Sequence, residues 1–207
     1  MVAARGAHTL ALKADGTVLS WGDDQYGQLG LGRQLFFASP TQISQVTTAR
    51  EISAGVGHSV ALLDDGTVAS WGDNAFGQLG DGTTADHSSP SRMNGLANVA
   101  SIAAGGYHTL ILVGDGDVWS VGNNEAGQIG DSSIVTKKSP VKVGDLTGIT
   151  ALAAGQYHSV ALKNDGSVWT WGYNAFGQLG DGTSSDSYAP ARVNGLTDVV
   201  AIAAGSY

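Results

Sequence analysis

The chain has 207 residues, 42% of them hydrophobic, and contains no cysteine, which excludes disulfides, thiolate nucleophiles and cysteine-ligated zinc. Eighteen acidic against ten basic residues give a net charge of -8, which repels phosphate backbones and disfavours nucleic acid as a direct partner. The longest apolar runs, such as residues 199–204, are far shorter than the ~20 residues of a membrane helix, so no membrane partner is expected. Residues 1–5 are too short for a signal peptide, and the compartment, secreted or cytoplasmic, stays open.

A constant interval of 50 residues organises the chain. Within each interval a histidine is followed by Asp-Gly, then Trp-Gly or Val-Gly, then Gly-Gln-Leu-Gly or Gly-Gln-Ile-Gly, and then a proline. A period of this length is the signature of a repeat architecture in which each repeat is one supersecondary unit. We therefore expect a single repeat domain over residues 1–207. Its units are about 1–50, 51–100, 101–150 and 151–200, with residues 201–207 starting or completing another blade.

Each unit is expected to form four short β-strands, because apolar stretches of about 4 to 6 residues alternate with Gly, Asp and Asn turns and no 3.6-residue stripe is sustained. In the third unit these strands are residues 99–104, 108–112, 117–121 and a short outer strand, 140–143, that begins with a proline. Asp-Gly between strands two and three predicts a tight hairpin. Tiny residues in strand one, as in Ala-Ala-Gly, suit a crowded central axis. The sequence thus predicts an all-β propeller built from four-stranded blades.

The motifs Ala-Ala-Gly-x-Tyr-His, Asp-Gly-x-Val, Trp-Gly-x-Asn and Gly-Gln-Leu-Gly at this period resemble the regulator of chromosome condensation repeat, in a bacterial style. The resemblance covers essentially the whole chain and implies a propeller, typically of seven blades, whereas this chain offers four units. Residues 201–207 align with residues 1–7, so two segments match one strand-one position. We expect either a partial ring or one half of an eight-bladed ring that two copies form as a homodimer.

Residues that recur in every unit are interpreted as structural. We expect that in each blade the repeated histidine begins strand two and hydrogen-bonds backbone; a metal site made of these imidazoles is the alternative. The tryptophans in register are expected to pack between adjacent blades rather than to form a carbohydrate platform or a photosensing cluster. The structural repeat residues are His8, His58, His108, His158, Trp21, Trp71 and Trp171.

Catalytic signatures are absent from the sequence. There is no calcium-loop spacing, no phosphate loop ending in Gly-Lys-Ser/Thr, no Gly-x-Ser-x-Gly turn and no candidate acid/base pair. We therefore predict no enzyme activity, no catalytic residues, no metal and no cofactor.

The segment between Gly-Gln-Leu-Gly and proline differs in every unit, so it is free to specify a partner. Three copies are polar, and the first contains Leu-Phe-Phe, which is typical of an interaction hot spot unless the rings fold back onto a blade. The candidate binding residues of these variable loops are Gln34, Leu35, Phe36, Phe37, His87, Ile134, Val135, Lys137, Lys138 and Tyr188.

The predicted function is a non-enzymatic protein-binding scaffold, with partner choice set by the variable loops. The resemblance implies two more specific functions. A similar fold serves secreted bacterial inhibitors of β-lactamase. The namesake of the family exchanges guanine nucleotide on a small GTPase. Exchange is the alternative function, and it predicts a rim with acidic and aromatic groups. The fold supports unrelated activities, so it does not name the partner.

Overall fold

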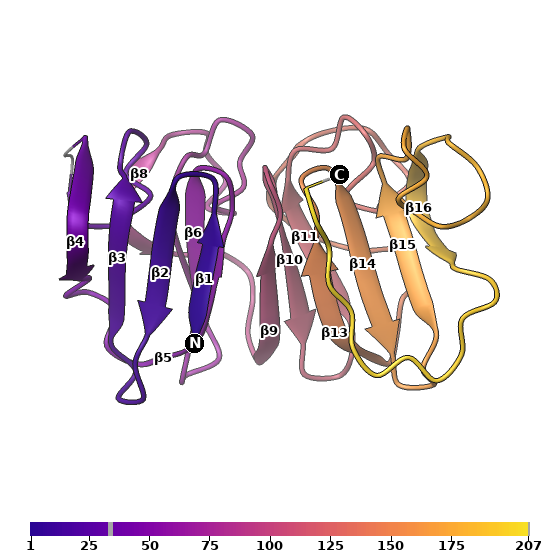
Figure 1. Cartoon of the computed structure of the whole chain (residues 1–207), viewed down its shortest axis with the longest axis horizontal. Coiled ribbons are helices and arrows are strands. Elements are labelled where there is room, and N and C mark those ends of the chain that lie inside the picture. Colours follow the sequence, from indigo (N-terminus) through magenta and orange to yellow (C-terminus); the bar gives the residue numbers. More distant parts are fainter. Residues whose placement is uncertain (33–34, 207) are drawn as a thin grey trace.

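The computed structural model describes residues 1–32 and 35–206, and within these ranges the regular secondary structure consists of β-strands (Figure 1). The strands form four separate four-stranded antiparallel sheets, and in each sheet they are neighbours in chain order. Repeated four-stranded sheets of this kind are propeller blades. The predicted all-β fold with four-stranded blades is therefore confirmed, and the chain forms part of a propeller. No helix in the described ranges is long and apolar enough to cross a membrane.

The strands of each blade run from the inner to the outer position. Blade one contains β1 (Val2–Arg5), β2 (His8–Leu12), β3 (Val18–Asp23) and β4 (Phe36–Gln42). Blade two contains β5 (Ala49–Ala54), β6 (His58–Leu63), β7 (Val68–Gly72) and β8 (His87–Arg92). Blade three contains β9 (Val99–Ala104), β10 (His108–Val113), β11 (Val118–Gly122) and β12 (Lys137–Lys142). Blade four contains β13 (Ile149–Ala154), β14 (His158–Lys163), β15 (Val168–Gly172) and β16 (Ser187–Arg192).

The predicted hairpin between strands two and three occurs at Asp-Gly. In blade two the Leu63 N–H donates to the Thr67 carbonyl (2.9 Å), and the Thr67 N–H donates to Asp65 Oδ1 (3.0 Å). Gly66 has a φ of 76°, in the left-handed region that glycine adopts without a steric penalty. Asp-Gly therefore supplies both the side-chain acceptor and the backbone conformation that the turn needs.

The outer strand of blade three differs from the predicted one. It begins at Lys137 rather than Pro140, so the expectation that proline starts this strand was wrong. The β11–β12 register shifts between Ser120 and Gly122, and Pro140 falls in the stretch that this irregularity leaves outside the ladder. A residue without an N–H is tolerated at a bulge in an edge strand, because no ladder bond is lost there.

The hydrophobic core lies between the blades. Leu10 and Val18 of blade one pack with Ile52 and Trp71 of blade two, and equivalent clusters join blade two to three and blade three to four. Because each cluster takes residues from two sheets, a blade completes its core only against its neighbour.

Residues 199–206 lie along the open face of blade four, and the yellow end of the chain runs beside β14 in Figure 1. Val199 and Ile202 pack against the cluster that contains Val160 and Leu162. The Gln156 N–H donates to the Ser206 carbonyl (3.1 Å), just as the equivalent N–H in blade two donates to Gly106 (3.2 Å). This segment therefore occupies the place that the inner strand of a following blade takes in the earlier units.

Arg5 of β1 connects the inner strands across the axis. Its Nη1 donates to the carbonyls of Ala154 (2.8 Å) and Ala104 (3.3 Å), and its Nη2 donates to Gly205 (3.5 Å). The small residues of strand one leave these carbonyls within reach of the guanidinium, so one side chain links blade one to blades three and four and to the final segment.

Candidate functional site

The candidate site lies at one end of the blades, which we call the loop face. It carries the short connections between strands one and two and the long connections between strands three and four, residues 73–86, 123–136 and 173–186 among them. The opposite end, the hairpin face, carries the Asp-Gly hairpins, which lie at the bottom of Figure 1. The candidate binding residues that the structure describes belong to the loop face or to the outer strands that leave it.

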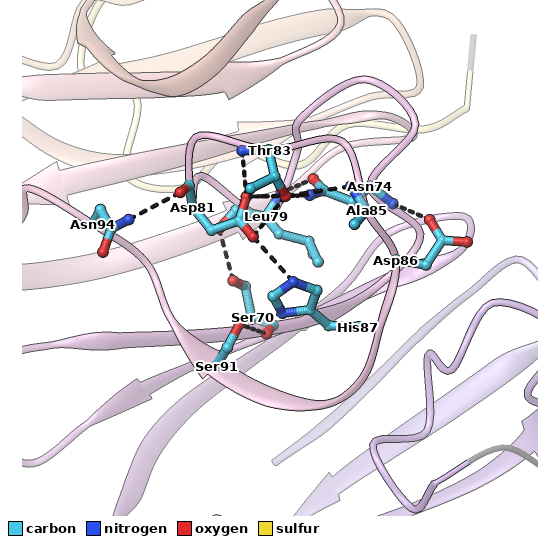
Figure 2. A network of polar contacts seen from close by, with 10 residues as sticks. All are labelled: Ser70, Asn74, Leu79, Asp81, Thr83, Ala85, Asp86, His87, Ser91 and Asn94. Carbon is cyan, nitrogen blue, oxygen red and sulfur yellow. Dashed lines mark hydrogen bonds and ion pairs between the residues drawn. The ribbon is translucent and has the colours of Figure 1, made fainter.

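The long connections are held by a buried asparagine. In blade two, Asn74 Oδ1 accepts from the Leu79 N–H (3.0 Å) while its Nδ2 donates to Asp81 Oδ1 (3.2 Å), as Figure 2 shows. Asn124 and Asn174 repeat this arrangement in blades three and four. The loops that carry the variable residues are thus built on a common, hydrogen-bonded base.

The first unit changes both members of this pair. Asp24 stands where the later units have asparagine, and its Oδ1 still accepts from the Leu29 N–H (2.9 Å). A carboxylate cannot donate, and Leu31 stands where the later units have aspartate. The paired change avoids two carboxylates facing each other in unit one.

His87 and Lys137 occupy equivalent positions and both pair with the aspartate of their own loop. His87 Nε2 lies 3.0 Å from Asp81 Oδ2 and its Nδ1 lies 2.7 Å from Ser91 Oγ (Figure 2). Lys137 Nζ lies 2.7 Å from Asp131 Oδ2. Sequence reasoning placed both side chains in loops, but each is the first residue of an outer strand, β8 or β12. The side-chain nitrogen atoms of both residues are engaged within the blade.

The apolar candidates that the structure describes are exposed, except Phe37, which is half-buried. Leu35 and Phe36 are 78% and 66% exposed, and Phe36 and Phe37 begin strand β4 rather than lying in a loop. Gln34 lies outside the described residues. Every outer strand starts before its proline, which explains why residues read as loop belong to strands.

A second group of exposed apolar residues lies between blades three and four. Ile134 and Val135 are exposed on the loop of blade three, and Tyr188 is exposed on β16. The Ser132 N–H donates to the Tyr188 carbonyl (2.9 Å), which brings this loop against the next outer strand. Lys138 takes the same place beside the loop of blade two, where its carbonyl accepts from Gly82 (2.9 Å).

A row of aromatic rings crosses the loop face and was not among the predicted site residues. Consecutive ring centroids are 5.6, 5.6, 6.3 and 6.2 Å apart, and the second pair is stacked while the others meet edge to face. The rings belong to Phe76, Tyr107, Tyr157, Tyr173 and Phe176. They come from three different positions of the repeat, so comparison at one register position does not reveal the row.

The repeated histidines join consecutive blades through hydroxyl groups. His8 Nε2 lies 2.9 Å from Ser59 Oγ, and that hydroxyl donates to the Gln28 carbonyl (2.7 Å). Because the hydroxyl proton is used, Nε2 is the donor to Ser59. His58 and His108 repeat the arrangement one and two units later. The imidazoles thus bond to side-chain hydroxyl groups of the next blade, and the expectation of a backbone partner was wrong.

The electrostatics of these imidazoles follow from burial. Burial lowers the pKa of His58 to about 3, with smaller effects of the nearby His8 and Arg5. Burial also lowers the pKa of His108 to about 3 and that of His8 to about 4. These imidazoles are neutral, and each donates its Nε2–H to a buried hydroxyl of the next blade, which holds the two blades together. In residues 1–32 and 35–206, no group of three or more His, Asp or Glu residues could hold a metal ion.

The tryptophans in register lie at the same contacts between consecutive blades, which we call joints. Trp71 and Trp171 are fully buried, and their Nε1–H groups donate to the carbonyls of Gln28 and Gln128, both at 2.8 Å. Each ring therefore belongs to one blade and bonds to the preceding one. Trp21 is only half-buried, because no preceding blade covers it within the described residues.

Comparison with known proteins agrees with this architecture. Prp20p from Saccharomyces cerevisiae, described by its crystal structure and by its binding properties to Gsp1p and histones, is 30% identical to this chain. The match covers 94% of this chain and 50% of Prp20p, with a TM-score of 0.84. Yeast RCC1 (Prp20), in a structure bound to Kap60, is 29% identical to this chain. The match covers 94% of this chain and 48% of yeast RCC1, with a TM-score of 0.80. Human WBSCR16 is 24% identical to this chain, and the match covers 99% of this chain and 69% of WBSCR16, with a TM-score of 0.76. At this identity the similarity shows the fold alone.

The chain spans about half the length of the Prp20 chains that it matches. A family model described as the RCC1-like domain matches residues 1–207. The four units, their four-stranded blades and this match over the full sequence agree, and the chain belongs to the RCC1-like domain family.

Proposed function

We propose that this chain is a non-enzymatic protein-binding platform whose loop face contacts the partner. The observation that carries the proposal is the aromatic row, which runs over blades two to four and ends at Phe176, 74% exposed. Tyrosine and phenylalanine are enriched in the buried centres of protein interfaces, where they supply contact area at a low entropic cost. The membership in the RCC1-like domain family, whose neighbours bind other proteins, supports the same function.

The variable loop residues extend this surface outwards. Leu35 and Phe36 lie on blade one, and Ile134, Val135 and Tyr188 lie between blades three and four. Their side chains are exposed and differ from unit to unit, so we propose that they set the choice of partner while the aromatic row supplies the shared contact area.

Affinity capture with paired variants tests the proposal. The wild-type chain is immobilised and exposed to the proteome of its source, beside a loop-face variant, Tyr173→Asn with Phe176→Ser, and a hairpin-face control, Lys13→Ala. Tyr173→Asn introduces the residue that the same position holds in unit three, so the fold should tolerate it. A protein retained by the wild type and the control but lost by the loop-face variant supports the proposal. Equal retention by all three, or no retained protein, overturns it.

Guanine-nucleotide exchange on a small GTPase is the second candidate. The similarity to Prp20p, which was studied for its binding to Gsp1p, favours it. Release of labelled GDP from a purified small GTPase, measured with and without the chain, separates exchange from simple binding. Faster release assigns exchange to the chain, whereas binding without release leaves the platform function alone.

We also propose that two copies complete one ring of eight blades. Among the described residues, the backbone of residues 199–206 pairs with no strand. This segment and the half-buried Trp21 mark the two ends that a second copy would cover. In the ring, each final segment would lie at the contact between its own blade four and the partner's first blade, whose inner strand is β1. Pairing of such edges and burial of such faces are strong driving forces for association.

A further inference from the structure

The aromatic row depends on a repeat position that one unit leaves small. Tyr26, Phe76, Ala126 and Phe176 are equivalent residues in the four units. The Phe76 ring meets the Tyr107 ring of the next blade edge to face at 5.6 Å. Tyr26 likewise reaches the next blade, where a Cβ added to Gly57 would lie 3.3 Å from its ring. The aromatic residue of one unit therefore fills the space beside the following blade.

Ala126 leaves this space open between blades three and four. The hollow has a volume of about 440 Å³, within the range of sites for small ligands and single side chains. Two of its walls are the rings of Tyr157 and Tyr173. Their ring centroids lie 6.3 Å apart, and their planes meet at 69°. The residues that line the hollow are Asn123, Glu125, Ala126, Tyr157, Tyr173 and Asp186.

The rim of the hollow is negatively charged. Glu125 and Asp186 are both exposed, and no ion pair within the described residues includes either of them. One oxygen of Asp186 accepts from the Asn174 N–H (2.8 Å), which fixes the carboxylate at the edge of the site. The chain as a whole has a net charge of -8, so the field around the hollow favours a cation.

We infer that this hollow receives an arginine side chain of the protein partner. A planar guanidinium stacks on tyrosine faces and pairs with carboxylates at the same time, which neither an apolar nor an anionic side chain can do. One of the two tyrosine rings would stack on the guanidinium plane while the other, at 69° to the first, would meet its edge, and Glu125 and Asp186 would accept its N–H groups. The inference rests on the proposed protein-binding function and names the partner chemistry of its loop face.

A short peptide tests the site without any partner protein. The peptide acetyl-Gly-Arg-Gly-amide is titrated into the full chain with labelled tyrosine rings, and the ring signals are followed by NMR. The matched probe replaces arginine with citrulline, which has the same shape and no charge. We expect saturable shifts of the Tyr157 and Tyr173 signals with the arginine peptide, at least a tenfold weaker response with citrulline, and weakening in 1 M salt. Equal responses to both peptides would overturn the inference.

Two variants connect the response to the hollow. Ala126→Phe installs the ring that the equivalent position holds in unit two, and it should abolish the shifts. Glu125→Gln with Asp186→Asn keeps the shape and should weaken arginine binding at least tenfold, so the test holds even if the larger side chain disturbs the loop. Undiminished binding by the charge variant, or by a folded Ala126→Phe protein, contradicts the inference.

The preceding joint provides a matched control. Phe76→Ala opens the same space beside Tyr107, but there Ala75, Asn123 and Thr136 replace the glutamate, the second tyrosine and the loop aspartate. We expect this variant to gain no arginine site. Peptide binding at Ala126 without any captured protein would refute the platform function alone, whereas capture without peptide binding would refute only the arginine inference.

Discussion

His108 Nε2 lies 2.9 Å from Ser159 Oγ, and this contact joins the second strands of blades three and four. The serine hydroxyl in turn donates to Gln128 of blade three (2.8 Å), so the chain of bonds leaves one blade, enters the next and returns. The same arrangement at His8 and His58 makes these buried imidazoles a test of how the blades are held together.

The stability of the protein should depend on pH through these histidines. The pKa of His58 is lowered to about 3 in the fold, from an ordinary value of 6.5 in the unfolded chain. The unfolded chain therefore binds this proton first, and the free energy of unfolding should fall as the pH drops from 6.5 toward 3, and be independent of this group above 6.5. Urea unfolding between pH 4.5 and 7.5 measures the slope. His58→Gln should reduce it by up to about one proton; His87→Gln, outside the joints, should leave the His58 contribution in place.

Trp71→Phe should destabilise the joint between blades one and two by roughly 1–2 kcal/mol, because the indole N–H bond to Gln28 is lost with part of the buried ring. The Gln28 carbonyl keeps the hydroxyl of Ser59 as a donor, which limits the cost. Equilibrium urea unfolding gives the difference. Trp119→Phe, at a half-buried ring, is the control and should cost less; equal losses would contradict a special role of the joint.

Gly127→Ala should destabilise the fold more than Gly177→Ala does. Both glycines have a left-handed backbone, with φ of 79° and 76°, so both substitutions carry a similar conformational cost of about 1–2 kcal/mol. A Cβ at Gly127 would lie 2.5 Å from Tyr188 Cδ1, while at Gly177 the nearest atom is the Thr183 carbonyl oxygen at 3.8 Å. Thermal unfolding of the two variants isolates the contact between the blade-three loop and β16. A smaller loss of stability for Gly127→Ala than for Gly177→Ala would show that the blade-three loop does not pack against β16.

Phe36→Ala with Phe37→Ala should weaken partner binding without lowering the melting temperature appreciably, since Phe36 is 66% exposed on an edge strand and exposed sites change stability by about 0.5 kcal/mol or less. Calorimetry on the free chain and binding to a captured partner are measured together. A large loss of melting temperature would place the pair in the core instead.

Light scattering should give the mass of two chains at micromolar concentration. Val200 is 91% exposed on the final segment, and Trp21 is half-buried at the other end, so Val200→Asp and Trp21→Arg should each shift the mass to one chain. Lys13→Ala on the hairpin face should leave it unchanged. A one-chain mass for the wild type, with a sharp unfolding transition, would exclude the eight-bladed dimer.

The 50-residue interval was sufficient to predict the blades, because each motif performs the same local task in every unit: Asp-Gly makes a hairpin and Trp-Gly ends a strand at a joint. The start of the outer strand could not be predicted, because the irregularity between Ser120 and Gly122 is a property of pairing and has no signature in apolar alternation. Pro140 was the most conspicuous residue there, yet it lies inside β12.

The contacts between the blades and the aromatic row could not be predicted from the sequence, because their partners belong to different repeat units. The partner of His8 is 51 residues away and belongs to the next unit, and the hydroxyl that it meets is serine in two units and threonine in another. Tyr107 and Phe76 become neighbours only when two blades pack. The candidate residues of the variable loops stay predictions.

The bonds between the blades restrict how such a chain can change in length. Each joint combines the histidine and the glutamine carbonyl of one unit with the hydroxyl of the next, all at fixed places within the 50-residue period. Deleting or duplicating one whole period returns an equivalent set of partners at the new junction. Removing half of a period would bring a histidine opposite the wrong strand and leave buried donors unpaired. Growth by complete units is therefore the mode of lengthening or shortening that this architecture tolerates.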